Sequence, residues 1–234
     1  MCGRVIAKSP AEVLVALFGV ERRQGDMPEP LPRRYNGAPG LEYPLIIREP
    51  DMPGSTFMMA KWGFVPAWWT PDKGLPRRPV NAMAETVATN GMFRGAYRSH
   101  RALMPVDGYF EWKAIKEKVK QPYAIALTHG RPFALAAIWD RYRDAGGVEW
   151  KTFCVITCAA NELMSRIHDR MPVILAPEDY DRWLGEEPDP RELLRPFPSV
   201  HMTMWPVSTR VNSVANDDPS LIDPIEPEDG EPEA

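Results

Sequence analysis

The sequence predicts a single α+β domain, built on a mainly antiparallel, barrel-like β-sheet with several short flanking helices. Three observations support this prediction. Proline accounts for 26 of the 234 residues, about twice its average usage, and its spread along the chain favours short elements joined by fixed turns. Runs of strand composition outnumber those with a helical pattern. No repeat or shift of composition marks a domain boundary before the last residues.

The first elements follow from capping and turn signals. Ser9, Pro10 and Glu12 have the spacing of a capping box, with Ser9 as the N-cap residue, and predict a helix that runs to about Val20. Turn residues then lead into runs rich in β-branched and aromatic side chains. Strands are predicted there over residues 41–48 and 56–62.

The middle of the chain carries a strong hairpin signal. Asp107-Gly108 stands between two strand-like runs, which predicts that these runs pair with each other. Alternation along the second run sends Phe110 and Trp112 to one face and Glu111 to the other. Further strands are predicted over residues 122–128, 133–139, 150–157 and 201–207, and short helices over 81–89, 161–167, 177–184 and 190–194.

Charge is unevenly distributed. The formal net charge is -4, but residues 217–234 contain eight acidic residues and no lysine or arginine, so the remaining chain carries +4. Residues 1–223 form the predicted domain, and the acidic, proline-rich residues 224–234 form a tail that we expect to be disordered. A local excess of arginine at 77–101 is suited to a phosphate backbone; its alternative is a solvated loop.

Cysteine usage indicates a reduced compartment. Three cysteines do not make a disulfide framework, and no signal peptide precedes the chain, which predicts a cytoplasmic protein. The apolar run at 13–20 is far shorter than the ~20 residues that cross a bilayer, so no membrane partner is expected. Cys154 and Cys158 lie in a β-branched run and are interpreted as buried small hydrophobic residues. No metal and no cofactor is expected.

Cys2 offers the most distinctive chemistry in the sequence. Removal of Met1 would leave Cys2 with a free α-amine, whose reference pKa of about 7.7 to 8.0 leaves a useful uncharged fraction at neutral pH. An amine and a thiol on adjacent carbons condense with an aldehyde, first to an imine and then to a thiazolidine ring. An internal cysteine has an amide nitrogen and cannot do this. The alternative is an ordinary second residue without chemistry.

Several separated stretches together resemble the SOS response-associated peptidase family, whose members are also called abasic-site processing proteins. The resemblance follows chain order over nearly the whole sequence and stops at the acidic tail. The stretches that carry it are Met1-Cys-Gly-Arg4, Arg34-Tyr-Asn36, Trp62-Gly-Phe-Val-Pro66, Val80-Asn-Ala-Met-Ala-Glu-Thr86, Pro105-Val-Asp-Gly-Tyr-Phe-Glu-Trp112, Ile167-His-Asp-Arg-Met-Pro172 and the closing segment from Pro206 to Ile222.

The resemblance implies a monomeric sensor of abasic sites in single-stranded DNA that acts in the DNA damage response. Such a protein forms a covalent DNA–protein crosslink, a thiazolidine, through Cys2 and the ring-opened deoxyribose. It implies lyase-like crosslinking chemistry, with peptidase activity that includes removal of its own Met1. In a bacterial-type cytosol the protein would be associated with the nucleoid when bound to DNA.

The same resemblance assigns catalytic roles to Cys2, Asn81, Glu111 and His168. Glu111 would supply the acid that opens the sugar, because its aromatic neighbours desolvate the carboxyl group and raise its pKa; its alternative is a surface glutamate paired with Lys113. His168 would carry protons at the sugar and imine, or complete a helix C-terminus. Asn81 would hold the Cys2 amine and the sugar in register, or cap a helix.

DNA binding would involve side chains from several parts of the chain. Base stacking by Trp68-Trp69 needs no particular sequence and is worth about 1 to 3 kcal/mol per base, although paired tryptophans also occur in cores. The family usually has Asn-Ala-Arg where this chain has Asn81-Ala-Met83, and a second arginine is Gly91 here, which puts two phosphate contacts in doubt. The residues assigned to DNA are Arg4, Asn36, Trp68, Trp69, Thr157 and Arg170.

A second enzyme class also fits the first residues. Class II glutamine amidotransferases begin Met-Cys-Gly and use the N-terminal thiol to attack an amide. Their downstream signatures are not found here. The N-terminal-nucleophile hydrolase of this type is therefore the alternative function, and it predicts release of ammonia from glutamine.

Overall fold

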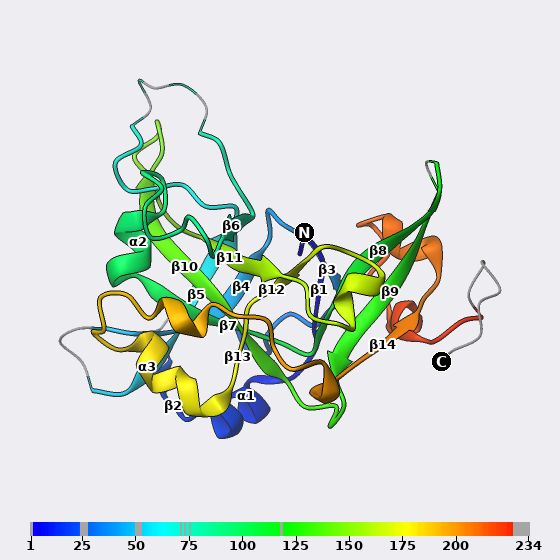
Figure 1. The fold of residues 1–234 in the computed structure, drawn as a ribbon. Coiled ribbons are helices and arrows are strands. Elements are labelled where there is room, and N and C mark those ends of the chain that lie inside the picture. The colour runs from blue at the N-terminus through cyan, green and yellow to red at the C-terminus, as the bar shows by residue number, and fades with distance from the viewer. Residues whose placement is uncertain are drawn as a thin grey trace.

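Five strands of the larger sheet close into a barrel, which lies beside a second sheet that contains β8, β9 and β14 (Figure 1). The computed structural model describes residues 2–23, 28–49, 53–70, 72, 74, 76–117 and 119–226. Strand β11 pairs with β10, β10 with β7, β7 with β4 and β4 with β5, all antiparallel, and a parallel pairing of β5 with β11 closes the ring. The predicted mainly antiparallel, barrel-like sheet is thus confirmed. The barrel strands are β4 (Glu42–Arg48), β5 (Ser55–Trp62), β7 (Arg101–Val106), β10 (Phe133–Arg143) and β11 (Glu149–Ala159).

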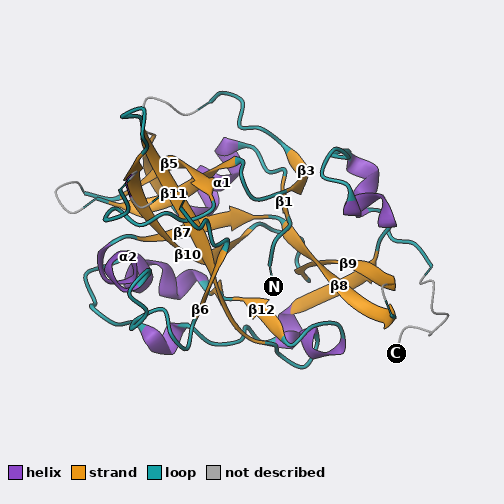
Figure 2. Ribbon diagram, turned by 90° about the horizontal axis from the view of Figure 1, so that it is seen from above, coloured by secondary structure: helices purple, strands orange, loops and turns teal. Residues whose placement is uncertain are grey.

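Short elements extend and cover this barrel. Among them, β6 and β12 lie on the two sides of β11, and β13 pairs with β10. Figure 2 shows the helices at the periphery of the strands. These elements are α1 (Ala11–Phe18), β2 (Val20–Arg23), β6 (Asn81–Met83), α2 (Arg94–Ser99), η2 (Met164–Arg166), β12 (Arg170–Pro172), β13 (Ile174–Leu175), η3 (Pro177–Asp179), α3 (Tyr180–Leu184) and η4 (Arg191–Leu193).

A second, open sheet stands beside the barrel and contains the N-terminal strand. Its order is β14-β9-β8-β1-β3, with antiparallel neighbours throughout. Strand β1 is therefore held between β8 and β3, which fixes the residues that precede it. The elements of this part are β1 (Val5–Ala7), β3 (Arg34–Gly37), β8 (Gly108–Lys116), β9 (Val119–Leu127), η5 (Ser199–His201), β14 (Met202–Pro206), η6 (Thr209–Asn212) and η7 (Pro219–Ile222).

The Asp107-Gly108 hairpin prediction is wrong, because β7 and β8 do not pair with each other. β7 belongs to the barrel and β8 to the open sheet, so the dipeptide is a crossover between sheets. Asp107 accepts hydrogen bonds from the backbone N–H groups of Lys8 (2.7 Å) and Ser9 (3.0 Å). At Gly108 a Cβ atom would lie 2.7 Å from the Ile125 carbonyl oxygen, so glycine serves close approach of two strands here and not a tight turn.

Two predicted helical features also differ. The Ser9 hydroxyl donates to Asp107 (2.6 Å) instead of capping a helix, and α1 starts after Pro10 without a side-chain cap. Residues 81–89 begin as strand β6, because Asn81 to Met83 pair with β11, and only turns follow. Tertiary partners decide both cases, since a buried carboxylate and an open strand edge offer better hydrogen bonds than a short isolated helix.

The core explains why the two faces of β8 differ. Tyr109 packs with the main hydrophobic cluster, which fills the barrel, whereas Phe110 belongs to a smaller cluster with Val207 and Leu221. Both rings are fully buried. The predicted alternation along this strand is confirmed, and it places Glu111 on the Tyr109 side, toward the barrel.

The C-terminal residues up to 226 continue along the open sheet. Val207 bridges to Pro224, and the Ile225 N–H donates to the Pro206 carbonyl oxygen (3.0 Å). Of the predicted disordered tail, residues 227–234 lie outside the described residues. Within the described part of the chain, no helix is long and apolar enough to cross a membrane.

Candidate functional site

Cys2 lies at the junction of the two sheets. Its backbone leads into β1, and the Arg4 carbonyl accepts the Phe110 N–H (3.0 Å), so β8 fixes this segment. The side-chain Nδ2 of Asn81 donates to the Cys2 carbonyl oxygen (2.8 Å). In the full-length chain Cys2 has no exposed surface. Burial raises the pKa of its thiol well above the usual range, and the charge of Glu111 adds to this rise.

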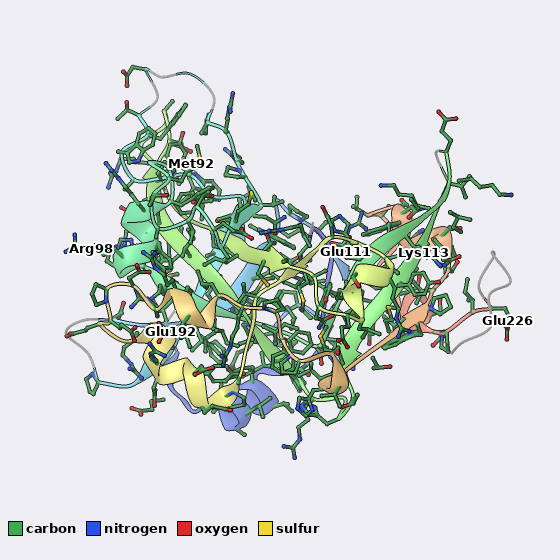
Figure 3. All side chains as sticks on the ribbon, viewed as in Figure 1. Met92, Arg98, Glu111, Lys113, Glu192 and Glu226 are labelled. Carbon is green, nitrogen blue, oxygen red and sulfur yellow. The ribbon has the colours of Figure 1, made fainter. Side chains whose placement is uncertain are left out.

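Glu111 faces Cys2 from strand β8. Figure 3 shows its side chain on the side of β8 toward the middle of the molecule. Only 3% of Glu111 is exposed, so the alternative of a surface glutamate is wrong. Burial raises the pKa of the neighbouring Tyr109 hydroxyl, and Cys2 and Glu111 contribute to the shift. A thiol, a carboxyl group and a phenol thus share one desolvated region.

Asn81 connects this region to the barrel. Strand β6 carries it beside Val155 of β11, and its amide nitrogen holds Cys2 instead of capping a helix. Its Oδ1 atom is buried and has no hydrogen-bond partner within the described part of the chain. A buried amide oxygen without a partner is a costly arrangement, and it is suited to accept a hydrogen from a free amine or a sugar hydroxyl.

His168 stands just before β12, after the single turn of η2. Its Nδ1 accepts the Arg170 N–H (2.9 Å), and the same atom lies 2.9 Å from Asp169 Oδ1. These contacts exclude each other, because the first needs an unprotonated nitrogen and the second a protonated one. The Arg170 amide is fixed in a strand, while the Asp169 side chain is 88% exposed. The backbone contact therefore makes Nδ1 the acceptor and leaves the proton on Nε2.

Arg170 is held in a bidentate ion pair. Its Nη1 and Nη2 donate to Glu85 Oε1 (2.6 Å) and Oε2 (2.9 Å), and Nη2 also donates to the Thr157 carbonyl oxygen (2.7 Å). The hydrogen bonds that Arg170 donates to Glu85 lower the pKa of Glu85 and raise the pKa of Arg170. Thr157 is fully buried. The structure thus brings Arg170 and Thr157 together. The Glu85 carboxylate already supplies the negative charge that pairs with Arg170.

Arg4 and Asn36 form a second cluster. The Arg4 Nη1 donates to Asn36 Oδ1 (2.7 Å) and to the Val211 carbonyl oxygen (2.8 Å), and its guanidinium lies over the Trp112 ring. Burial lowers the pKa of Arg4. The amide nitrogen of Asn36 donates to three backbone carbonyl oxygens of residues 211–216, and Asn36 is 2% exposed. Asn36 anchors that segment, and DNA contact by its side chain stays a prediction.

Trp68 and Trp69 lie between β5 and β6, at a turn of the chain. Their ring centroids are 5.8 Å apart, and Trp68 is 50% exposed. Asp140 of β10 accepts the Ala67 N–H (2.9 Å), which ties the start of this turn to the barrel. An exposed aromatic ring on an anchored turn is suited to stacking against a base, so the geometry favours the DNA-binding interpretation over a core position for Trp68.

The arginines of the predicted basic stretch at 77–101 have two different environments. Arg101 is 6% exposed, and its guanidinium donates to the backbone carbonyl oxygens of Trp183 (2.5 Å), Tyr97 (2.9 Å) and Glu187 (2.8 Å). It is a structural residue, and the prediction that it follows phosphates is wrong. The remaining arginines of this stretch are exposed, as are Met83 and Gly91.

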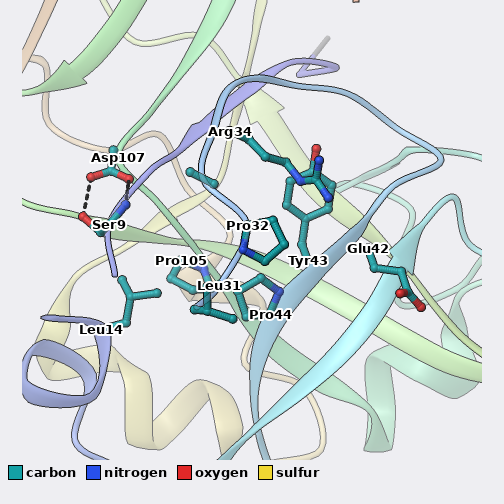
Figure 4. Close-up of a pocket in the computed structure, with 11 residues that line it drawn as sticks. Ser9, Leu14, Leu31, Pro32, Arg34, Glu42, Tyr43, Pro44, Pro105 and Asp107 are labelled. Carbon is teal, nitrogen blue, oxygen red and sulfur yellow. Dashed lines mark hydrogen bonds between the residues drawn. The ribbon is translucent and has the colours of Figure 1, made fainter. Parts of the chain in front are cut away.

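A pocket beside Tyr43 is too small for a nucleotide, and no metal site is found among the described residues. Figure 4 shows a cavity of about 20 Å³ beside Tyr43, lined also by Leu14, Leu31 and Asp107. Such a volume holds about one water molecule, so a nucleotide cannot enter. Within the described residues, no three His, Cys, Asp or Glu side chains are grouped to hold a metal ion. Cys154 and Cys158 are buried free cysteines, as predicted.

Sequence reasoning assigned no role to Glu85 and Tyr109. Both lie within motifs that carry the family resemblance. Glu85 stands four residues after Asn81, and Tyr109 stands two residues before Glu111. Strand alternation placed Tyr109 on the face of Glu111. No local signal indicates that Glu85 pairs with Arg170, because 85 residues separate them in the chain.

The chain is similar to known proteins over nearly its whole length. A family model described as SOS response associated peptidase (SRAP) matches residues 1–214. The abasic site processing protein YoqW of Bacillus subtilis is 34% identical over 230 residues, covering 95% of this chain and 99% of that protein. The abasic site processing protein YedK of Escherichia coli is 34% identical over 233 residues, covering 96% and 100%.

A vertebrate relative and a solved structure extend the comparison. The abasic site processing protein HMCES of Gallus gallus is 29% identical and aligns with 97% of this chain and 78% of its own length. The X-ray structure of a Bacteroides thetaiotaomicron protein matches with a TM-score of 0.83 at 27% identity, covering 96% of this chain and 100% of that one.

Proposed function

The chain belongs to the SOS response-associated peptidase family, and we propose that it processes abasic sites in single-stranded DNA by forming a covalent thiazolidine crosslink through Cys2. The observation that carries the proposal is the convergence of Cys2, Asn81 and Glu111. The Asn81 amide holds the Cys2 carbonyl at 2.8 Å, and the Glu111 charge raises the pKa of the Cys2 thiol. Family membership favours this function over glutamine hydrolysis.

Removal of Met1 comes first, either by the protein itself or by a separate aminopeptidase. With Met1 attached, the Cys2 nitrogen is an amide, whose lone pair is delocalised into the carbonyl group and does not attack an aldehyde. Removal of this residue creates the α-amine. The unpartnered Asn81 Oδ1 then accepts a hydrogen from the new amine, which directs its lone pair toward the sugar.

The reaction balances with loss of one water. Glu111 donates a proton to the ring oxygen of the closed deoxyribose, the C1′–O4′ bond breaks, and the carboxylate so formed takes up the C1′ hydroxyl proton as the aldehyde is released. The Cys2 amine adds to C1′, and water leaves as the imine forms. The thiol then adds to the imine carbon, its proton passes to the nitrogen, and the five-membered ring closes. His168, with Nε2 protonated, relays protons at the sugar hydroxyl and at the imine.

The DNA strand is held by groups around this centre. The exposed Trp68 ring stacks on an unpaired base, which favours single-stranded DNA over a duplex. Arg170 and Arg4 face phosphates, although each already has partners within the protein. Crosslinking of the monomeric protein to its DNA substrate would bring it to the nucleoid. The proposal includes no peptidase activity on other proteins.

The test is a covalent adduct on a denaturing gel. Single-stranded DNA with one abasic site should give a species that survives boiling in detergent, with a mass equal to both partners minus one water. DNA without the lesion should give none. Cys2→Ala should abolish the adduct, and intact mass should show Met1 absent from the reactive protein. Adduct formation by Cys2→Ala at the wild-type level would refute the mechanism, and ammonia release from glutamine would support the alternative.

A further inference from the structure

A basic groove leads away from the Arg170–Glu85 pair toward helix α2. It consists of two open depressions of about 430 Å³ each. The first contacts Glu85 and Arg195, and the second is lined by Arg94 and Arg98 of α2. Their shared walls are formed by Ala88, Thr89 and Arg191. We call this surface the arginine groove; Figure 3 shows Arg98 at its α2 end, on the side of the molecule away from Glu111.

The arginine groove carries a positive excess in a chain whose net charge is -4. Its two carboxylates already have partners: Glu85 pairs with Arg170, and Asp189 pairs with Arg191 and accepts the Tyr97 hydroxyl. Across the described part of the chain, no carboxylate pairs with the other three arginines, which are Arg94, Arg98 and Arg195. These three exposed guanidinium groups remain available to an anionic ligand.

The lining of the groove indicates what kind of anion fits. The lining includes small side chains such as Ala88 and Thr89, and Tyr97 is 2% exposed. No stacking platform for a base is therefore offered, whereas three guanidinium groups suit a row of phosphates. We propose that the arginine groove binds the sugar-phosphate backbone of the strand that continues from the abasic site. These contacts would not depend on the base sequence, as a lesion-binding protein requires.

The groove begins next to the reactive centre. Asn81 holds the Cys2 carbonyl oxygen (2.8 Å), and Glu85, four residues further along the chain, lines the first depression. A strand whose abasic sugar lies at Cys2 can therefore pass the Arg170–Glu85 pair and enter the groove. The inference rests on the proposed function, because that function places the sugar. The arginine groove also supplies phosphate contacts in place of the two that Met83 and Gly91 do not offer.

Equilibrium binding tests this path without the covalent step. The ligand is a fluorescent single strand with a central tetrahydrofuran residue, which has no C1′ hydroxyl and cannot open to an aldehyde. Binding is measured by anisotropy over a range of salt for the full-length protein, for Arg98→Gln/Arg195→Gln and for the control Arg48→Gln/Arg131→Gln. Both double variants lose two positive charges from exposed positions. Two further ligands end shortly after the lesion, one on its 5′ side and one on its 3′ side.

The groove variant should lower the magnitude of the salt slope by about 1.4, because a single-strand phosphate contact contributes about 0.7, and the control should leave it unchanged. The difference in salt slope between groove variant and wild type should disappear with the truncated ligand that lacks the strand in the groove. It should persist with the other truncated ligand. Equal slopes for wild type and groove variant, or a defect that persists with both truncated ligands, would overturn the inference. Crosslinking of a true abasic strand at saturating DNA should match wild type; failure of wild type to crosslink would instead refute the proposed function.

Discussion

Glu111 and Glu85 have opposite surroundings. Glu111 is 3% exposed and shares its region with Cys2 and Tyr109. The Glu85 side chain is 49% exposed and is held by both nitrogens of the Arg170 fork. A carboxylate fixed by a bidentate arginine stays ionised and serves as a positioning group. A buried carboxyl group beside the reactive thiol is instead placed for proton transfer.

This difference separates chemistry from binding within one site. The Cys2 region contains the groups for proton transfer and covalent bond formation, and the Arg170 region contains a cation that an internal carboxylate already occupies. An incoming phosphate must compete with Glu85 for Arg170. The two regions can therefore be altered independently, because each carboxylate acts on a different residue.

The largest expected effect is on the rate of crosslinking. Glu111→Gln keeps the size of the side chain but cannot donate a carboxylic proton, so crosslink formation should slow by on the order of 100-fold. Glu85→Gln should leave the rate at saturating DNA unchanged and tighten DNA binding a few-fold at low salt, because Arg170 loses its internal competitor. Single-turnover gels and anisotropy measure the two quantities. Equal slowing by both variants would contradict the division of roles.

A second prediction uses the thiols as local probes of charge. Burial raises the pKa of Cys2 and raises that of Cys158 to about 12, and the carboxylates of Glu111 and Glu85 respectively contribute to these rises. Alkylation by iodoacetamide should therefore increase with pH without a plateau near the ordinary thiol pKa of about 8.5.

Removing one carboxylate should lower the pKa of its own thiol and so increase the thiolate fraction at a given pH. Glu111→Gln should speed the alkylation of Cys2 a few-fold and leave Cys158 unchanged, and Glu85→Gln should do the reverse. Peptide mass spectrometry resolves the two sites. If Glu111→Gln affected both cysteines equally, a general loosening of the fold would explain the result better than local charge.

The smallest effect concerns Met83, which is 47% exposed on the strand that carries Asn81. Met83→Arg adds a cation near the Arg170–Glu85 pair and should steepen the salt dependence of single-strand binding by about 0.7. The control is Val200→Arg, because Val200 is also exposed but lies in η5. An unchanged slope in Met83→Arg would mean that phosphates do not pass this position.

The failed predictions share a physical cause. Asp107-Gly108 is a good hairpin turn locally, but Asp107 binds the backbone before α1 and Gly108 allows close contact with Ile125, so the chain passes between two sheets. Arg101 looked like its exposed neighbours in the sequence, yet its guanidinium holds the carbonyl groups around the end of α3. Such partners are distant in the chain, and no local pattern reveals them.

The sequence by itself determined the strand-rich barrel fold, the alternation that turns Glu111 toward the core and the family to which the chain belongs, because these depend on periodicity and on motifs in order. Only the tertiary structure decided which carboxylate is buried beside Cys2, which is held by Arg170 and which arginines remain exposed. Burial and ion pairing depend on strands that meet across the fold, and therefore on contacts between residues far apart in the chain.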